Sequence, residues 1–98
     1  MRASRNSVDH QYSMTKSVTV NIDTDYTTPA RGLLCVGGYS DVVIEVKIDG
    51  IRALCFKASL IAGNSNTQYA LPVPKGAVIH LYVLSGDTVR FNLRKFYY

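Results

Sequence analysis

The stretch DVVIEVKIDGIRALCFKASLI, residues 41–61, decides the fold class of this chain. It contains two runs rich in β-branched and other apolar residues, Asp41–Ile48 and Ile51–Ile61, which flank the dipeptide Asp49-Gly50. Asp and Gly both tolerate the positive φ that a tight type I′ turn requires, so this dipeptide between apolar runs is a strong hairpin signal. The stretch therefore predicts two antiparallel strands.

Strand-like runs also fill the chain on both sides of this hairpin. From Ser17 to Ile22, apolar and polar residues alternate with the period of two that is typical of a half-buried strand. Further strands are expected over residues 33–36 (ended by Gly37-Gly38), 67–73, and 77–84 with 88–98 as a final hairpin, whereas residues 23–30, 63–66 and 74–76 are expected to be loops or turns. Because no helical period is evident, we expect an all-β fold, an antiparallel β-sandwich or jelly roll of seven to eight strands.

The length and the local composition predict one folded domain with an arm. The 98 residues are enough for a single domain only. Residues 1–16 are polar and show no apolar period, so we interpret them as a flexible N-terminal arm, and residues 17–98 as a single β-sandwich domain. If the arm anchors the domain to a partner, the candidate anchoring residues are Arg2, Arg5 and Tyr12.

The apolar content is high for so small a chain. Apolar residues make up 47% of the sequence, whereas a domain of this size buries only about two-thirds of the surface of its unfolded chain. The strands at 42–48 and 77–84 are apolar on both faces, which indicates either central strands covered by a loop or strands that contact another copy of the chain. The second interpretation predicts a homo-oligomer whose candidate interface residues are Val43, Ile79, Leu81 and Val83.

Charge and hydropathy argue against two classes of partner. The net charge is +4, from 11 Lys and Arg against 7 Asp and Glu, and the cations are spread through the chain. Nucleic-acid-binding domains usually cluster their cations on one face, so no nucleic-acid partner is expected. No membrane partner is expected either, because no run approaches the roughly 18 apolar residues of a membrane-spanning helix. The N-terminus carries no secretory pattern, which favours synthesis in the cytoplasm.

The residues capable of catalysis are few and scattered. Glu45 is the only glutamate and is expected on a solvated strand face, and His80 lies in an apolar run where a structural hydrogen bond is its usual role. Cys35 and Cys55 are both set in apolar runs, which is typical of core thiols, although a disulfide between them stays possible. With His10 and His80 they show no spacing typical of metal ligands. We therefore expect no enzyme activity, no cofactor and no metal.

The seven tyrosines favour recognition of a ligand, because tyrosine combines flat contact area with a polar group. Tyr39 and Tyr69, with Asn64 and Asn66, fall in or near expected loops and are the candidate ligand-binding or receptor-binding residues. The alternative is that these tyrosines pack over the ends of the sandwich.

Three segments together resemble a known family. YTTPARGLL at 26–34 resembles a Y-T-A-P-x-D-G element, LPVPKG at 71–76 a P-V-x-K-G-D element, and the chain end at 89–98 a closing F-Y-P element, all found in small β-sandwich modules of phage virion and tail-fibre proteins. The match spans residues 26–98 and departs from the pattern at Arg31, Ala77 and Tyr98.

The resemblance implies a non-enzymatic virion protein. Such modules serve in capsid decoration, head fibres or tail fibres and are often trimeric, so the implied partners are further copies of the chain and a major capsid or tail protein. The alternatives are a carbohydrate-binding or receptor-binding lectin-like module that recognises a host surface glycan, and a small inhibitor of a host enzyme.

Overall fold

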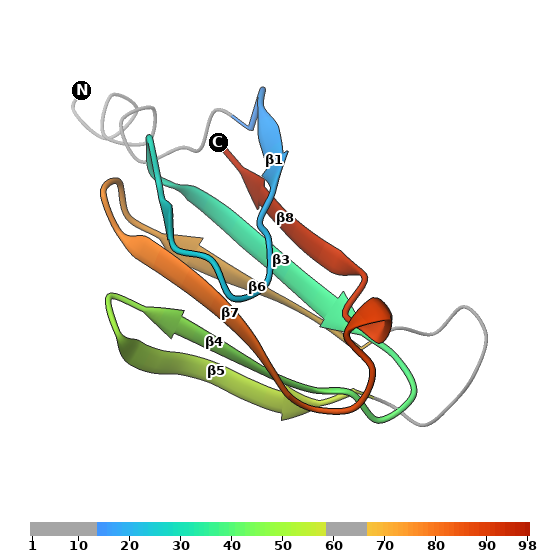
Figure 1. Cartoon of the computed structure of the whole chain (residues 1–98). Coiled ribbons are helices and arrows are strands. Elements are labelled where there is room, and N and C mark those ends of the chain that lie inside the picture. The colour runs from blue at the N-terminus through green and yellow to red at the C-terminus, as the bar shows by residue number, and fades with distance from the viewer. Residues whose placement is uncertain (1–13, 59–66) are drawn as a thin grey trace, which may run out of the picture.

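The computed structural model describes residues 14–58 and 67–98 as two four-stranded antiparallel sheets (Figure 1), which confirms the all-β sandwich prediction. The arm prediction for residues 1–16 falls almost entirely outside these ranges. The described strands are β1 (Ser17–Thr19), β2 (Tyr26–Thr27), β3 (Gly32–Gly38), β4 (Val43–Ile48), β5 (Ile51–Lys57), β6 (Thr67–Val73), β7 (Val78–Ser85) and β8 (Leu93–Tyr97), with a 3₁₀ turn η1 (Thr88–Arg90) before β8.

The strand order identifies the sandwich as a jelly roll. The first sheet has the order β1-β8-β3-β6 and the second β2-β7-β4-β5. The antiparallel pairs are therefore nested, since β4 pairs with β5, β3 with β6, β2 with β7 and β1 with β8. This arrangement results when one long antiparallel ribbon folds over on itself into two sheets. Figure 1 shows the strands of both sheets along the same long direction of the molecule.

The β4–β5 hairpin forms as the sequence predicts. Asp49 and Gly50 have φ values of 53° and 78°, and Ile48 pairs directly with Ile51 across the turn. The Asp49 carboxylate also accepts a hydrogen bond of 2.9 Å from the Val78 amide, which joins the turn to β7.

The final hairpin prediction is wrong, because β7 and β8 lie in different sheets. Asp87 begins η1 instead of closing a hairpin turn, since its carboxylate accepts a hydrogen bond of 3.1 Å from the Val89 amide. The chain then continues to the other sheet through Phe91, whose side chain is 1% exposed and buried in the core. A turn signal marks where a strand ends but does not say which sheet the next strand joins.

The first predicted strand is also divided between the sheets. Ser17–Thr19 pairs with β8 and Val20 still donates a backbone hydrogen bond to Arg94 of that strand, whereas Ile22 forms an isolated bridge with Leu81 of the other sheet. The expected loop at 23–30 contains β2, which pairs with β7. The alternation of Val18 and Ile22 around the buried Val20 continues across the change of sheet because both sheets face one core.

The positions of two predicted interface residues in the core contradict part of the oligomer-interface prediction. Ile79 and Leu81 are fully buried between the two sheets and are not available to another copy. Val83 packs partly buried against the same core and Val43 is half-buried, so these two residues stay predicted interface residues. The other core side chains are Val20, Leu34, Val36, Val42, Ile44, Val46, Phe56, Ala58, Val73, Ala77, Phe91 and Phe96.

Candidate functional site

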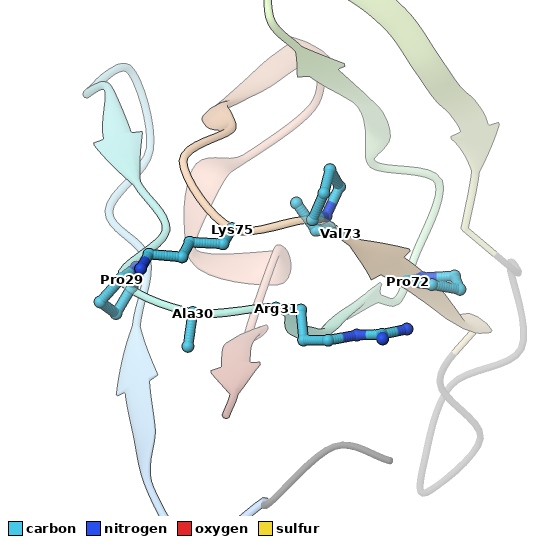
Figure 2. Close-up of a pocket in the computed structure, with 7 residues that line it drawn as sticks. Pro29, Ala30, Arg31, Pro72, Val73 and Lys75 are labelled. Atoms are coloured by element: carbon cyan, nitrogen blue, oxygen red, sulfur yellow. The ribbon is translucent and has the colours of Figure 1, made fainter. Parts of the chain in front are cut away.

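A groove of about 640 Å³ lies at one end of the sandwich (Figure 2). One wall is the link from β2 to β3, and the other is the end of β6 with the turn that leads to β7. Its lining consists of Pro29, Ala30, Arg31, Pro72, Val73, Pro74 and Lys75. All 3 prolines of the chain therefore line this groove.

Thr28 joins the two walls. Its hydroxyl donates a hydrogen bond of 2.7 Å to the Pro74 carbonyl oxygen and accepts one of 3.1 Å from the Ala77 amide. The Thr28 carbonyl accepts a further bond of 2.9 Å from the Gly76 amide, and the Thr28 amide donates to the Ala77 carbonyl at 2.9 Å. Thr28 is 2% exposed, so these bonds are shielded from water and hold the walls at a fixed separation.

The groove has apolar walls and two positively charged side chains. Proline rings fix φ near −65° and carry no amide hydrogen, so this lining is rigid and poor in backbone donors. Arg31 and Lys75 supply positive charge from opposite walls, and the lining includes no carboxylate, imidazole, hydroxyl or thiol side chain. In Figure 2 the Arg31 side chain extends toward Pro72, whereas the Lys75 side chain extends toward Pro29.

Polar side chains gather on the outer face of the second sheet. The His80 Nδ1 atom lies 2.6 Å from the Asp25 carboxylate, and the His80 ring stacks on Tyr82 with centroids 4.4 Å apart. The Lys47 ammonium lies 5.2 Å from the centre of the Tyr82 ring. His80 thus has the hydrogen-bonded structural role that its sequence position predicts, with Tyr82 two positions along the same strand and Lys47 on the neighbouring strand.

Glu45 lies on the same face, and its predicted solvated position is wrong. The residue is 6% exposed, and its Oε2 atom accepts a hydrogen bond of 2.5 Å from Arg52 Nε. This hydrogen bond, together with the Glu45 charge, raises the pKa of Arg52. Arg52 itself reaches into solvent, so an exposed cation covers the buried Glu45 carboxylate.

The cysteines are not core residues, contrary to the sequence prediction. Both are free thiols, with Cys35 half-buried on β3 and Cys55 exposed on the edge strand β5. Burial raises the pKa of the Cys35 thiol above its ordinary value.

The outer face of the first sheet carries neighbouring apolar side chains, with Ser17, Thr19, Gln68 and Lys95 beside them. The register places Leu33 beside Pro72 and Tyr97, and Cys35 beside Ala70 and Lys95. Successive side chains on a strand point to opposite faces, so these residues lie opposite the buried side chains of β3 and β8. We call this the apolar outer face, and its members are Leu33, Cys35, Ala70, Pro72, Leu93 and Tyr97.

The candidate ligand residues are only partly covered by the structure. Tyr39 is half-buried after β3, and Tyr69 lies within strand β6, 44% exposed and with its ring 4.7 Å from that of Phe56. Gly38 pairs with Thr67, so both tyrosines lie toward one end of the first sheet. Asn64, Asn66, Arg2, Arg5 and Tyr12 lie outside the described residues.

Sequence reasoning missed the groove, although it marked both of its walls as turns. The signal was the concentration of all 3 prolines in two segments, but their sequence separation hid the fact that the segments meet. In the described ranges 14–58 and 67–98, no three His, Cys, Asp or Glu side chains come together as metal ligands. No helix of these ranges has the length and hydropathy to cross a membrane. Comparison with protein-family models, curated proteins and solved structures gives no match.

Proposed function

We propose that this protein is a non-enzymatic structural protein of a phage virion, a capsid-decoration, head-fibre or tail-fibre module that assembles as a homo-oligomer, most simply a trimer. Residues 1–16 anchor it to a major capsid or tail protein. The jelly-roll strand order supports the proposal because viral capsid domains are among the proteins that use it, and the resemblance of residues 26–98 points the same way. One fold serves many functions, so the proposed assembly rests on the surface of the protein and not on its fold.

The observation that carries the assembly is the apolar outer face. A sheet with one wet face usually alternates apolar-in with polar-out, but here Leu33, Leu93 and Tyr97 point away from the core. Lys95 is the one charged residue that the register places among them in the described chain. Contiguous apolar patches of this kind mark interaction sites, and a second copy of the chain would cover this one.

The proposal that this protein is not an enzyme rests on how its polar side chains are arranged. Two polar pairs lie on a sheet face, Asp25 with His80 and Glu45 with Arg52, and the members of each pair are hydrogen-bonded to each other. The lining of the groove presents neither a nucleophile with a base nor a carboxylate pair.

The oligomeric state tests the assembly. Light scattering coupled to size exclusion should give a multiple of the 10.8 kDa chain mass. Ala70→Glu places a charge on the apolar outer face and should reduce the mass to that of a monomer, because a buried unpaired carboxylate is costly. Ala53→Glu is the matched control, since Ala53 is an exposed alanine on an edge strand of the other sheet. A monomeric parent protein, or equal behaviour of the two variants, contradicts the proposed interface.

Particle composition tests the virion assignment separately. The full chain should co-purify with virions and be located on them by electron microscopy, whereas the chain without residues 2–16 should fold and oligomerise but fail to attach. Absence from purified particles would refute the virion assignment and leave the oligomer unaffected.

A glycan-binding module is the second candidate, because Tyr69 keeps 44% of its surface exposed near the end of the sheet where Tyr39 lies. A glycan array distinguishes the two functions. Binding that Tyr69→Ala abolishes supports recognition, whereas no binding together with virion attachment supports the structural role.

A further inference from the structure

We propose that copies of this chain associate head to tail, with the apolar outer face of one copy packed against a different surface of the next copy. That second surface is the open side of the sandwich, where the edge strands β5 and β6 meet, and we define it by Phe56, Tyr69 and Leu71. Ala53, about 10 Å from Phe56 along β5, lies outside it. This contact rests on the assembly proposed above, for which it supplies the second surface.

The open side is an exposed edge of the core. Tyr69 pairs with Val36 and Leu71 pairs with Leu34. Both partners on β3 are fully buried, so the two β6 side chains point to the core side of the sheet as well. Tyr69 is nevertheless 44% exposed, because β6 is the last strand of its sheet. Its ring lies 4.7 Å from that of Phe56 in the opposite sheet, so the two rings form an aromatic surface at this edge.

The other side of the sandwich is covered by the chain itself. The link from β1 to β2 passes between the sheets there, and Val20 in this link is 1% exposed. Ile22, further along the link, bridges to Leu81 of the second sheet. In the described chain, the side that leaves an aromatic ring exposed is therefore the one between β5 and β6.

The outer face of the second sheet does not complement the apolar outer face of the first. It carries Lys47, His80 and the Glu45–Arg52 pair, and an apolar surface over these groups would remove them from water without giving them new partners. The open side instead offers apolar and aromatic area, whose burial against the apolar outer face of another copy is favourable.

The relative position of the two surfaces suits a closed ring. Strand β6 belongs to both, since Ala70 and Pro72 point outward from the sandwich whereas Tyr69 and Leu71 point to the core side. The surfaces are therefore adjacent, and each copy is rotated relative to the one before it, as a ring requires. Opposite faces would stack the copies in a line, and a face that pairs with itself would stop at two copies. A trimer needs contact between two different surfaces, and these two meet that need.

Mixing two variants tests this arrangement, with masses measured by light scattering coupled to size exclusion. Tyr69→Glu disables the open side and Ala70→Glu disables the apolar outer face, and each variant alone should be a monomer, because the contact would bury its added charge. The mixture keeps one intact surface of each kind. At about 0.1 mM, which compensates for the absence of ring closure, it should therefore give complexes of twice the 10.8 kDa chain mass.

The matched control is Tyr82→Glu, which makes the same exchange on the polar outer face of the second sheet, beside His80. This variant should keep the mass of the parent protein.

The outcomes distinguish the head-to-tail contact from the assembly itself. If Tyr69→Glu keeps the parent mass, or if the two monomeric variants do not combine when mixed, the head-to-tail contact is overturned and the oligomer stands. A monomeric parent protein refutes both. Thermal unfolding followed by circular dichroism checks that each variant folds. If Tyr69→Glu does not fold, Tyr69→Gln should raise the concentration at which copies associate at least about tenfold, and an unchanged concentration would overturn the contact.

Discussion

The Thr28 hydroxyl donates a hydrogen bond of 2.7 Å to the carbonyl oxygen of Pro74, a residue 46 positions further along the chain. The same hydroxyl oxygen accepts a hydrogen bond from the buried Ala77 amide. One side chain therefore connects the β2–β3 link to the β6–β7 turn, and the groove between them depends on it.

Thr28→Val should destabilise the fold by about 2 kcal/mol, because the isosteric side chain keeps the packing but leaves a buried amide without a partner. Urea unfolding followed by circular dichroism measures the change. Thr28→Ser, which keeps the hydroxyl, should cost less than Thr28→Val. Thr24→Val is the control, because Thr24 lies on the surface. If the two valine variants lose the same stability, the Thr28 bonds contribute little.

The turn at Gly50 gives a purely conformational prediction. Gly50 has φ of 78°, and a Cβ atom there would meet nothing within 4 Å, so any effect of substitution comes from backbone strain. Gly50→Val should cost roughly 1–2 kcal/mol, whereas Gly50→Asn should cost less, because asparagine visits the left-handed region more readily. Thermal unfolding of the two variants measures the difference. Equal melting temperatures would show that the turn does not need its positive φ.

The stability of the fold should depend on the hydrogen bond between Arg52 and the buried Glu45 carboxylate. Arg52→Ala removes the hydrogen bond and the cation from a carboxylate that is 6% exposed in the parent protein, so the variant should unfold at a lower urea concentration than the parent protein. Lys57→Ala is the matched control, because it removes a cation of the same strand from a looser surface pair with Asp41 at 3.7 Å. The control should change stability little. The double variant Glu45→Gln/Arg52→Ala should recover part of the stability that Arg52→Ala loses. If it recovers none, the loss comes from the packing of the aliphatic part of the Arg52 side chain and not from the Glu45 charge.

The two thiols should react at different rates. Cys55 is exposed on an edge strand, whereas Cys35 is half-buried and has a raised pKa that lowers its thiolate fraction at neutral pH. Reaction with a chromogenic disulfide reagent at pH 8 should therefore show one fast and one slow phase. Cys55→Ser should remove the fast phase alone, and loss of the slow phase instead would reverse the assignment.

Stability should fall in alkaline solution. Burial raises the pKa of Cys35 above 9.0, and burial with the nearby Tyr98 raises the pKa of Tyr26 above 10.0. The folded chain therefore binds more protons than the unfolded chain above these values, so this stabilisation is complete below about pH 9 and is lost as pH rises through the folded pKa values. Unfolding free energies between pH 7.5 and 10.5 measure the slope. Cys35→Ala and Tyr26→Phe should each flatten it, and an unchanged slope in both would show that other groups are responsible.

Local sequence features determined the class of the fold and several of its elements. Alternating side chains predict strands because the strand period is two, and Asp49-Gly50 predicts its turn because few other pairs tolerate positive φ. These signals need only neighbouring residues, and so β4, β5 and β6 lie close to where they were expected.

The tertiary structure alone decided which strands share a sheet and which surfaces exist. Strands that face a common core alternate in the same way in either sheet, so β7 and β8 read as a hairpin although they lie in opposite layers. The same lack of long-range information hid the burial of Ile79 and Leu81 and the meeting of the two proline segments around Thr28. Each of these depends on residues distant in the sequence, and the free energy that selects them comes from burial across the whole core, not from any one segment.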